Sequence, residues 1–128
     1  MFDRMPARLR DGAPRMVDVG GKVPTARKAV AEGVIRMAAE TAHAIEAGQT
    51  RKGNVLLIAE LAGITGAKRT ADLIPLCHPV ALTSVTVRLE VDRSLPGVRA
   101  VATAEVVERT GVEMEALTAV TVALLTVY

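Results

Sequence analysis

Alternating apolar and polar positions between residues 84 and 106 predict two β-strands. The apolar positions of the first strand are Val85, Val87, Leu89 and Val91. Those of the second are Val98, Ala100, Ala102, Ala104 and Val106. A period of two places all of these side chains on one face of each strand, as in a half-buried sheet. The residues between the strands include Pro96-Gly97, a strong turn signal. The sequence therefore predicts an antiparallel hairpin.

Earlier in the chain, apolar residues spaced by three and four predict a long helix over Ala26–Ala47. This stripe consists of Val30, Val34, Met37, Thr41 and Ile45. Thr25 is a suitable N-cap, and Gly48 is a suitable stop. Before this helix, Arg15–Val19 alternates well enough for a short strand, which Gly20-Gly21 would end.

Two further helices are predicted, and both are apolar on nearly all sides. The first is capped by Asn54 and runs to about Ile64, although Val55–Ile58 alone also fits a buried strand. The second begins near Thr110 and Glu113, which have capping-box spacing, so Glu113 has a structural interpretation as a cap. Its stripe is Leu117, Val120, Leu124 and Val127. Helices of this kind are buried or form interfaces.

Composition narrows the class of protein. The chain has 128 residues, with 50% hydrophobic but only 2% aromatic residues, a formal charge of +2 and a single cysteine. We therefore expect a mobile arm over residues 1–14 and a single domain over 15–128, without an internal disulfide. The charge is too small to indicate nucleic-acid binding, and neither a membrane span nor a signal peptide is evident. A cytoplasmic protein is the expectation.

Candidate chemistry gathers between Gly66 and Pro79, where the only cysteine, Cys77, is followed by His78. Pro75 and Pro79 each fix a backbone angle, so this stretch should be rigid and irregular. The structural interpretation is that Cys77 is a small buried hydrophobe and His78 a hydrogen-bonded structural group. Adjacent side chains point apart on an extended backbone, so the two are not interpreted as a nucleophile and its base.

Two segments, 67–79 (AKRTADLIPLCHP) and 110–119 (TGVEMEALTA), closely resemble the MoaC family of molybdenum cofactor biosynthesis proteins. Residues 16–19 and Lys52-Gly53 match it as well, so the resemblance extends from about Arg15 to Tyr128. It implies an α+β, ferredoxin-like fold, with an antiparallel sheet packed against helices on one face. It also implies a homohexamer, built as a trimer of dimers with active sites at the dimer interface.

The activity implied by the resemblance is that of a cyclic pyranopterin monophosphate synthase, a phosphorus–oxygen lyase. The substrate is (8S)-3',8-cyclo-7,8-dihydroguanosine 5'-triphosphate, a cyclised dihydro-GTP supplied by a radical SAM GTP cyclase, and pyrophosphate is released. Five residues match the family's substrate-binding positions: Leu76, Cys77, His78, Met114 and Glu115.

The residues can be compared with the chemistry that this reaction needs. Lys52, Lys68 and Arg69 are cations suited to a triphosphate. Lys52 and His78 are the catalytic candidates. A histidine readily gives and takes protons near neutral pH, which suits His78 to this role. Glu113 or Glu115 would accept protons or hold the N–H groups of the purine-derived ring. No tightly bound cofactor is expected. No metal-ligand spacing is present in the sequence, so Mg²⁺ would arrive with the triphosphate.

One departure from the family pattern follows Tyr128, where the family has an Asp-Met-Cys-Lys run and a further strand. Its Asp and Lys are regarded as catalytic. Either such a segment belongs to the protein beyond this sequence, or this 128-residue form is inactive. The alternative function is therefore a non-catalytic nucleotide-binding module of the same fold. A third possibility is a thiol- or metal-dependent hydrolase that uses Cys77 and His78.

Overall fold

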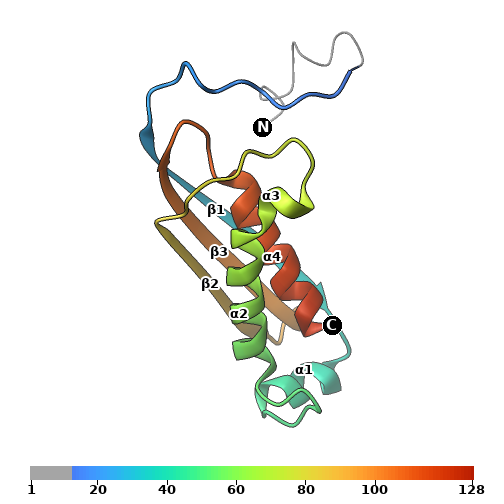
Figure 1. Cartoon of the computed structure of the whole chain (residues 1–128). Coiled ribbons are helices and arrows are strands. Elements are labelled where there is room, and N and C mark those ends of the chain that lie inside the picture. Colours follow the sequence, from blue (N-terminus) through green and yellow to red (C-terminus); the bar gives the residue numbers. More distant parts are fainter. Residues whose placement is uncertain (1–12) are drawn as a thin grey trace.

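The computed structural model describes residues 13–128, which form a three-stranded sheet with helices packed on one face (Figure 1). In chain order, the elements are β1 (Thr25–Arg36), α1 (Ala39–Glu46), α2 (Val55–Lys68), α3 (Thr70–Leu73), β2 (Ser84–Asp92), β3 (Gly97–Glu108) and α4 (Glu113–Val127). The predicted arm over residues 1–14 lies almost entirely outside the described residues. The α+β class, with an antiparallel sheet packed against helices, is confirmed.

The strand order is β1-β3-β2, and both outer strands run antiparallel to β3. The two outer strands therefore run in the same direction, with β3 inserted between them. Ala102 at the centre of β3 faces Ala31 on one side and Val87 on the other. Strands β2 and β3 form the predicted hairpin, with the predicted turn and the predicted buried face, so this prediction is confirmed.

Helices α2 and α4 lie side by side over the sheet (Figure 1). Small side chains fill the layer between them and the strands, and the completely buried alanines are Ala59, Ala100, Ala102, Ala104, Ala119 and Ala123. Glycines allow still closer approach. A Cβ added at Gly63 on α2 would lie 2.9 Å from the carbonyl oxygen of Ala119, and one at Gly33 on β1 would lie 2.7 Å from Val120. The core is therefore thin and tightly packed.

The predicted helix over Ala26–Ala47 is wrong for its first half, which is β1. A spacing of four places two residues on the same face of a strand as well as of a helix, so Val30 and Val34 fit either structure. In β1 these valines are exposed, at 61% and 40%. The inward positions carry small residues such as Ala31 and Gly33, which give a weak hydrophobic signal. The second half is helix α1, and Gly48 ends it in the left-handed region with φ 71°.

Other predicted boundaries have mixed outcomes. The predicted strand over Arg15–Val19 is wrong, since these residues have no regular structure. Helix α2 is confirmed and extends beyond Ile64; the side chain of Asn54 caps it by accepting a hydrogen bond from Leu57 N at 3.2 Å. Helix α4 is confirmed, but it begins at Glu113 with Val112 as N-cap and has no side-chain cap. The capping box is therefore wrong.

The predicted stripe of α4 is wrong at its first position. Leu117 is 48% exposed, whereas the alanines of α4 occupy the most deeply buried positions. Where α4 approaches the sheet most closely, only small side chains fit between them. The larger residues of α4 therefore lie beside the row of buried alanines or on the exposed side of the helix.

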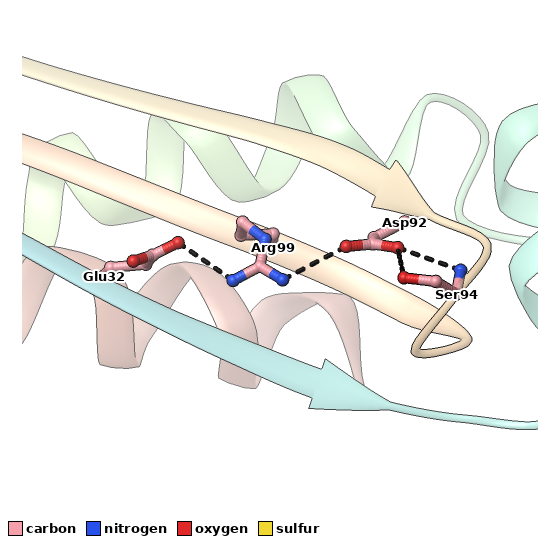
Figure 2. Close-up of polar contacts among 4 residues, drawn as sticks. All are labelled: Glu32, Asp92, Ser94 and Arg99. Carbon is pink, nitrogen blue, oxygen red and sulfur yellow. Dashed lines mark hydrogen bonds and ion pairs between the residues drawn. The ribbon is translucent and has the colours of Figure 1, made fainter.

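The sheet face that the helices leave open carries a polar network across all three strands (Figure 2). Arg99 of β3 donates to Glu32 of β1 at 2.9 Å and to Asp92 of β2 at 3.1 Å. Asp92 also accepts from the hydroxyl of Ser94 at 2.5 Å and from its backbone N–H at 2.9 Å. The Ser94 hydroxyl first, and then Arg99, lower the pKa of Asp92 from 3.8 to about 2. The network links β1 to the β2–β3 turn through charge-assisted bonds.

Replacing Asp92 should reveal a pH-dependent contribution of this network to stability. The folded pKa of Asp92 lies below its ordinary value, so its contribution is present above pH 3.8 and disappears as the pH falls through about 2. Asp92→Asn should therefore lower the melting temperature at pH 7, and the difference from the unsubstituted chain should vanish near pH 2. Thermal unfolding at several pH values measures this, with Glu60→Gln on α2 as a control. A difference that persists unchanged at the lowest pH would contradict it.

Gly97 should be intolerant of any side chain. A Cβ at this position would overlap the carbonyl oxygen of Ile35 on β1, which is backbone and cannot rotate away. We expect Gly97→Ala to destabilise the chain by about 3 kcal/mol, as overpacking of a rigid contact does. Urea unfolding measures the effect. The matched control is Gly21→Ala, because nothing lies within 4 Å of the added Cβ there. Equal stabilities of the two variants would refute the predicted clash.

Candidate functional site

The α3–β2 connection meets the first turn of α4 at one end of the molecule, and this junction is the candidate site (Figure 1). Cys77 and Glu115 make the contact. The thiol sulfur of Cys77 lies 3.6 Å from Oε2 of Glu115, within hydrogen-bonding range for sulfur. Two of the residues predicted from separate motifs are thus brought together by the fold, although neither motif alone indicated their contact.

A short rigid support holds the segment that carries Cys77. Thr70 is 1% exposed, and its hydroxyl donates to the carbonyls of Ala67 at 2.9 Å and Gly66 at 3.2 Å, where α2 passes into α3. The backbone N–H of Ile74 then donates to Thr70 O at 2.9 Å. The sequence did not indicate this supporting role of Thr70. The residue follows Lys68-Arg69 and precedes an alanine, and this pattern gives no sign that the threonine is buried.

Leu76 gives this segment an unusual conformation. Its φ is 66°, the left-handed region, which is unfavourable for a side chain with a Cβ. The following residue closes a turn, since Cys77 N donates to Ile74 O at 3.4 Å. Such a conformation persists where surrounding contacts determine it. The sequence predicts an irregular and rigid stretch between the two prolines. The irregular backbone is confirmed, and the rigidity stays a prediction.

Glu115 is nearly inaccessible, with 3% of its surface exposed. It lies on the same helix face as Ala119 and Ala123, four and eight residues later, which are both completely buried. The N-terminal turn of a helix favours negative charge, and α4 begins with Glu113 and Glu115. Its position in line with these buried alanines was a sequence signal for the burial of Glu115.

The remaining residues of the two motifs surround this contact to different degrees. His78 and Met114 are partly buried, and Leu76 is 46% exposed. Glu113 is exposed, and its carboxylate lies so close to Gly111 that a Cβ there would overlap it. His78 therefore lies at the boundary between the buried contact and the exposed positions around it.

Lys68 and Arg69 lie at the C-terminal end of α2, where the chain turns into α3. Both are exposed. Arg69 forms an ion pair with Asp72 at 3.7 Å, and both side chains are about 70% exposed (70% and 72%). Exposed pairs of this kind contribute little to stability, so Asp72 holds the Arg69 side chain only weakly.

Lys52 lies away from this group. Its ammonium donates to the carbonyl of Thr126 in the last turn of α4 at 2.9 Å, whereas Glu115 is in the first turn. Thr126 lies 11 positions after Glu115, which corresponds to about 16 Å along the helix. The prediction of one site containing Lys52 and His78 is therefore not met within a single chain.

A second contact missed from the sequence joins the segment before β1 to the β3–α4 connection. Arg109 donates from Nε to Lys22 O at 3.1 Å. Residues 20–24 are thus held beside the loop that leads into α4. The sequence gave no signal for this contact, because the two residues are 87 positions apart.

Two features of residues 13–128 bear on metal binding and membrane insertion. Within that range, no group of three or more His, Cys, Asp or Glu side chains is arranged to hold a metal ion. None of the helices there is long and apolar enough to cross a membrane. The junction combines a partly buried histidine, a buried carboxylate, a thiol and nearby exposed cations, which suits binding of an anionic molecule with proton transfer.

Comparison with known proteins gives two findings. The family model described as the MoaC family matches residues 16–128. Over 117 residues, the chain is 59% identical to the protein named cyclic pyranopterin monophosphate synthase of Dinoroseobacter shibae. This alignment covers 91% of the chain and 74% of the relative.

Proposed function

The chain belongs to the MoaC family, and we propose that it acts as a cyclic pyranopterin monophosphate synthase, a lyase of molybdenum cofactor biosynthesis. The observation that carries this proposal is the 59% identity over 91% of the chain to a synthase of that name. The alignment includes nearly all of the described structure, so it extends over both motifs that meet at the junction of Cys77 and Glu115.

The proposed substrate is the cyclised dihydro-GTP supplied by a radical SAM GTP cyclase, which is converted with release of pyrophosphate. Lys68 and Arg69 are exposed cations at the candidate site and would bind the phosphates. His78 would move protons during ring opening and closure. Leu76 and Met114 would line the ring-binding surface, and Glu113 offers an exposed carboxylate for N–H groups. Any Mg²⁺ would be held mainly by the triphosphate.

The position of Lys52 supports an active site shared between chains. One chain holds Lys52 and His78 near opposite ends of α4, so a site that uses both needs a second copy. We expect a homohexamer built as a trimer of dimers. Exposed apolar side chains on α2 and α4 favour such contacts: Leu57, Ile58, Leu61, Leu117, Leu125 and Tyr128.

The proposal also includes a ferredoxin-like arrangement. A helical segment separates β1 from β2, β2 and β3 form a hairpin, and a helix follows. Five successive parts of the βαββαβ pattern are thus present in order, and β3 lies between the outer strands as in a split βαβ unit. The two site motifs, residues 67–79 and 110–119, meet at one end of the sheet and its helices, so this fold would serve as the scaffold of the site.

Activity tests the proposal directly. The purified protein, including any segment that follows Tyr128, should release pyrophosphate when it is supplied with the cyclised dihydro-GTP. His78→Ala should lower kcat by about 100-fold, because general acid–base groups contribute factors of this order. His43→Ala is the matched control, since this exposed histidine on α1 lies outside the candidate site and should leave the rate unchanged. Tight binding of GTP with no turnover of the cyclised substrate would instead favour the non-catalytic binding module.

A mixing experiment tests the shared site. Lys52→Ala and His78→Ala should each be strongly impaired as pure proteins and should each keep the assembled state, as measured by light scattering. When the two variants are co-assembled in equal amounts, about a quarter of the sites should combine an intact Lys52 from one chain with an intact His78 from another. Pyrophosphate release should then rise. A mixture that stays as impaired as the pure variants while it remains assembled would show that the site is not shared in this way.

A further inference from the structure

The buried position of Glu115 changes the part it can play. Only 3% of its surface is exposed, so its carboxylate is poorly placed to be the main contact with a bound molecule. Its neighbour Cys77 is half-buried, and the sulfur lies 3.6 Å from Oε2. A thiol donates one hydrogen bond, and a carboxylate is acceptor-only when it is ionised. The pair therefore joins α4 to the α3–β2 connection at the point where the chain takes an unfavourable conformation.

We propose that the Cys77–Glu115 hydrogen bond is a positioning device that holds Leu76 in its left-handed conformation and thereby fixes the orientation of His78. This inference rests on the proposed function, since His78 is the proton-transfer group there. Cys77 then acts as a hydrogen-bond donor with its proton retained on sulfur, and it is a positioning residue that does not react. Glu115 acts through Cys77 from the rigid first turn of α4.

The conformation of Leu76 and two hydrogen bonds of Cys77 support this arrangement. Leu76 has φ 66°, a conformation that needs support from its surroundings. The backbone bond from Cys77 to Ile74 is long, at 3.4 Å, so it supplies limited restraint. The link to Glu115, by contrast, runs to an element 38 residues away that is anchored in the core. A connection to a buried helix restrains the segment more than a bond within the same turn.

The thiol has a second acceptor within reach, the carbonyl oxygen of His78, also at 3.6 Å. A single S–H group can serve only one acceptor well at a time. The carboxylate is the stronger acceptor, because hydrogen bonds to ionised groups are roughly twice as strong as neutral ones. The proposal therefore takes Glu115 as the acceptor of the S–H hydrogen bond, and the experiment must separate these two acceptors.

Infrared spectroscopy of the purified chain tests the bond without any substrate. Cys77 is the only cysteine in the 128 residues, so the S–H stretching band has a single source. The band should lie at lower frequency in the folded chain than in the urea-unfolded chain, because donation of a hydrogen bond lowers the S–H stretching frequency. In Glu115→Gln, which keeps the side-chain volume and removes the charge, the band should shift part of the way back. An unchanged band in folded Glu115→Gln would show that the S–H group donates to His78 O, and it would overturn the proposal.

Kinetics test the positioning role. Cys77→Ala removes the donor and should lower kcat by about tenfold while KM stays within about twofold, because His78 is misoriented rather than lost. Cys77→Ser keeps a donor and should restore most of kcat. Equal impairment of the Ala and Ser variants, or full activity of Cys77→Ala, would overturn the proposal. A loss of activity that is fully explained by a smaller amount of folded protein would overturn it as well. If Glu115→Gln does not fold, these two small substitutions still decide it.

The two proposals fail in different ways. If the unsubstituted protein, including any segment that follows Tyr128, releases no pyrophosphate, the proposed function is wrong, and the infrared comparison still decides whether Cys77 donates to Glu115. If pyrophosphate is released and Cys77→Ala equals the unsubstituted chain, the function stands and the positioning role is wrong.

Discussion

The fold depends on how closely two helices can approach a sheet whose central strand carries only alanine and valine on its inner face. The inward residues of β3 are nearly all alanine or valine, and they are almost completely buried. Gly33 of β1 and Gly63 of α2 lie where a single added carbon would meet α4 within 3 Å. Packing at this distance leaves α4 little freedom to slide or rotate, because close-packed interiors respond to changes as small as a methylene group.

This close packing has a consequence for chemistry at both ends of α4. Its first turn fixes Glu115 against Cys77, and its last turn accepts a hydrogen bond from Lys52. The same helix thus keeps Lys52 at one end and the segment that carries His78 at the other, although the proposed reaction needs these two side chains together. A rigid scaffold that exposes half of a site at each end fits an enzyme whose sites are completed by a neighbouring copy, with apolar side chains still exposed on the helices.

Different interactions stabilise the two faces of the sheet. The inner face is stabilised by apolar burial, and the outer face by the ion pairs of Arg99 with Glu32 and Asp92 (Figure 2). These charges lie in line across β1, β3 and β2, where the cross-strand register brings side chains within reach. The outer network strengthens the connection of β1 to the hairpin without taking space from the alanine-rich core.

Local patterns predicted well what local physics decides. The hairpin was found because strict alternation over two strands has one interpretation, and the α2 cap was found because Asn54 bonds within its own turn. The start of β1 was mistaken for a helix because Val30 and Val34 share a face in either structure, while the inward Ala31 and Gly33 are too small to reveal the true period. The capping box failed because α4 begins three residues after Thr110.

The sequence by itself determined the family, through two long motifs, and with it the residue types available for the chemistry. Only the tertiary structure decided which of these residues meet. Cys77 and Glu115 are 38 positions apart and touch, whereas Lys52 bonds to a carbonyl 74 positions away and lies far from His78. Periodicity reports only on neighbours along the chain. Contacts over such separations arise from the packing of whole elements, here from the small residues that let α4 lie close to the sheet.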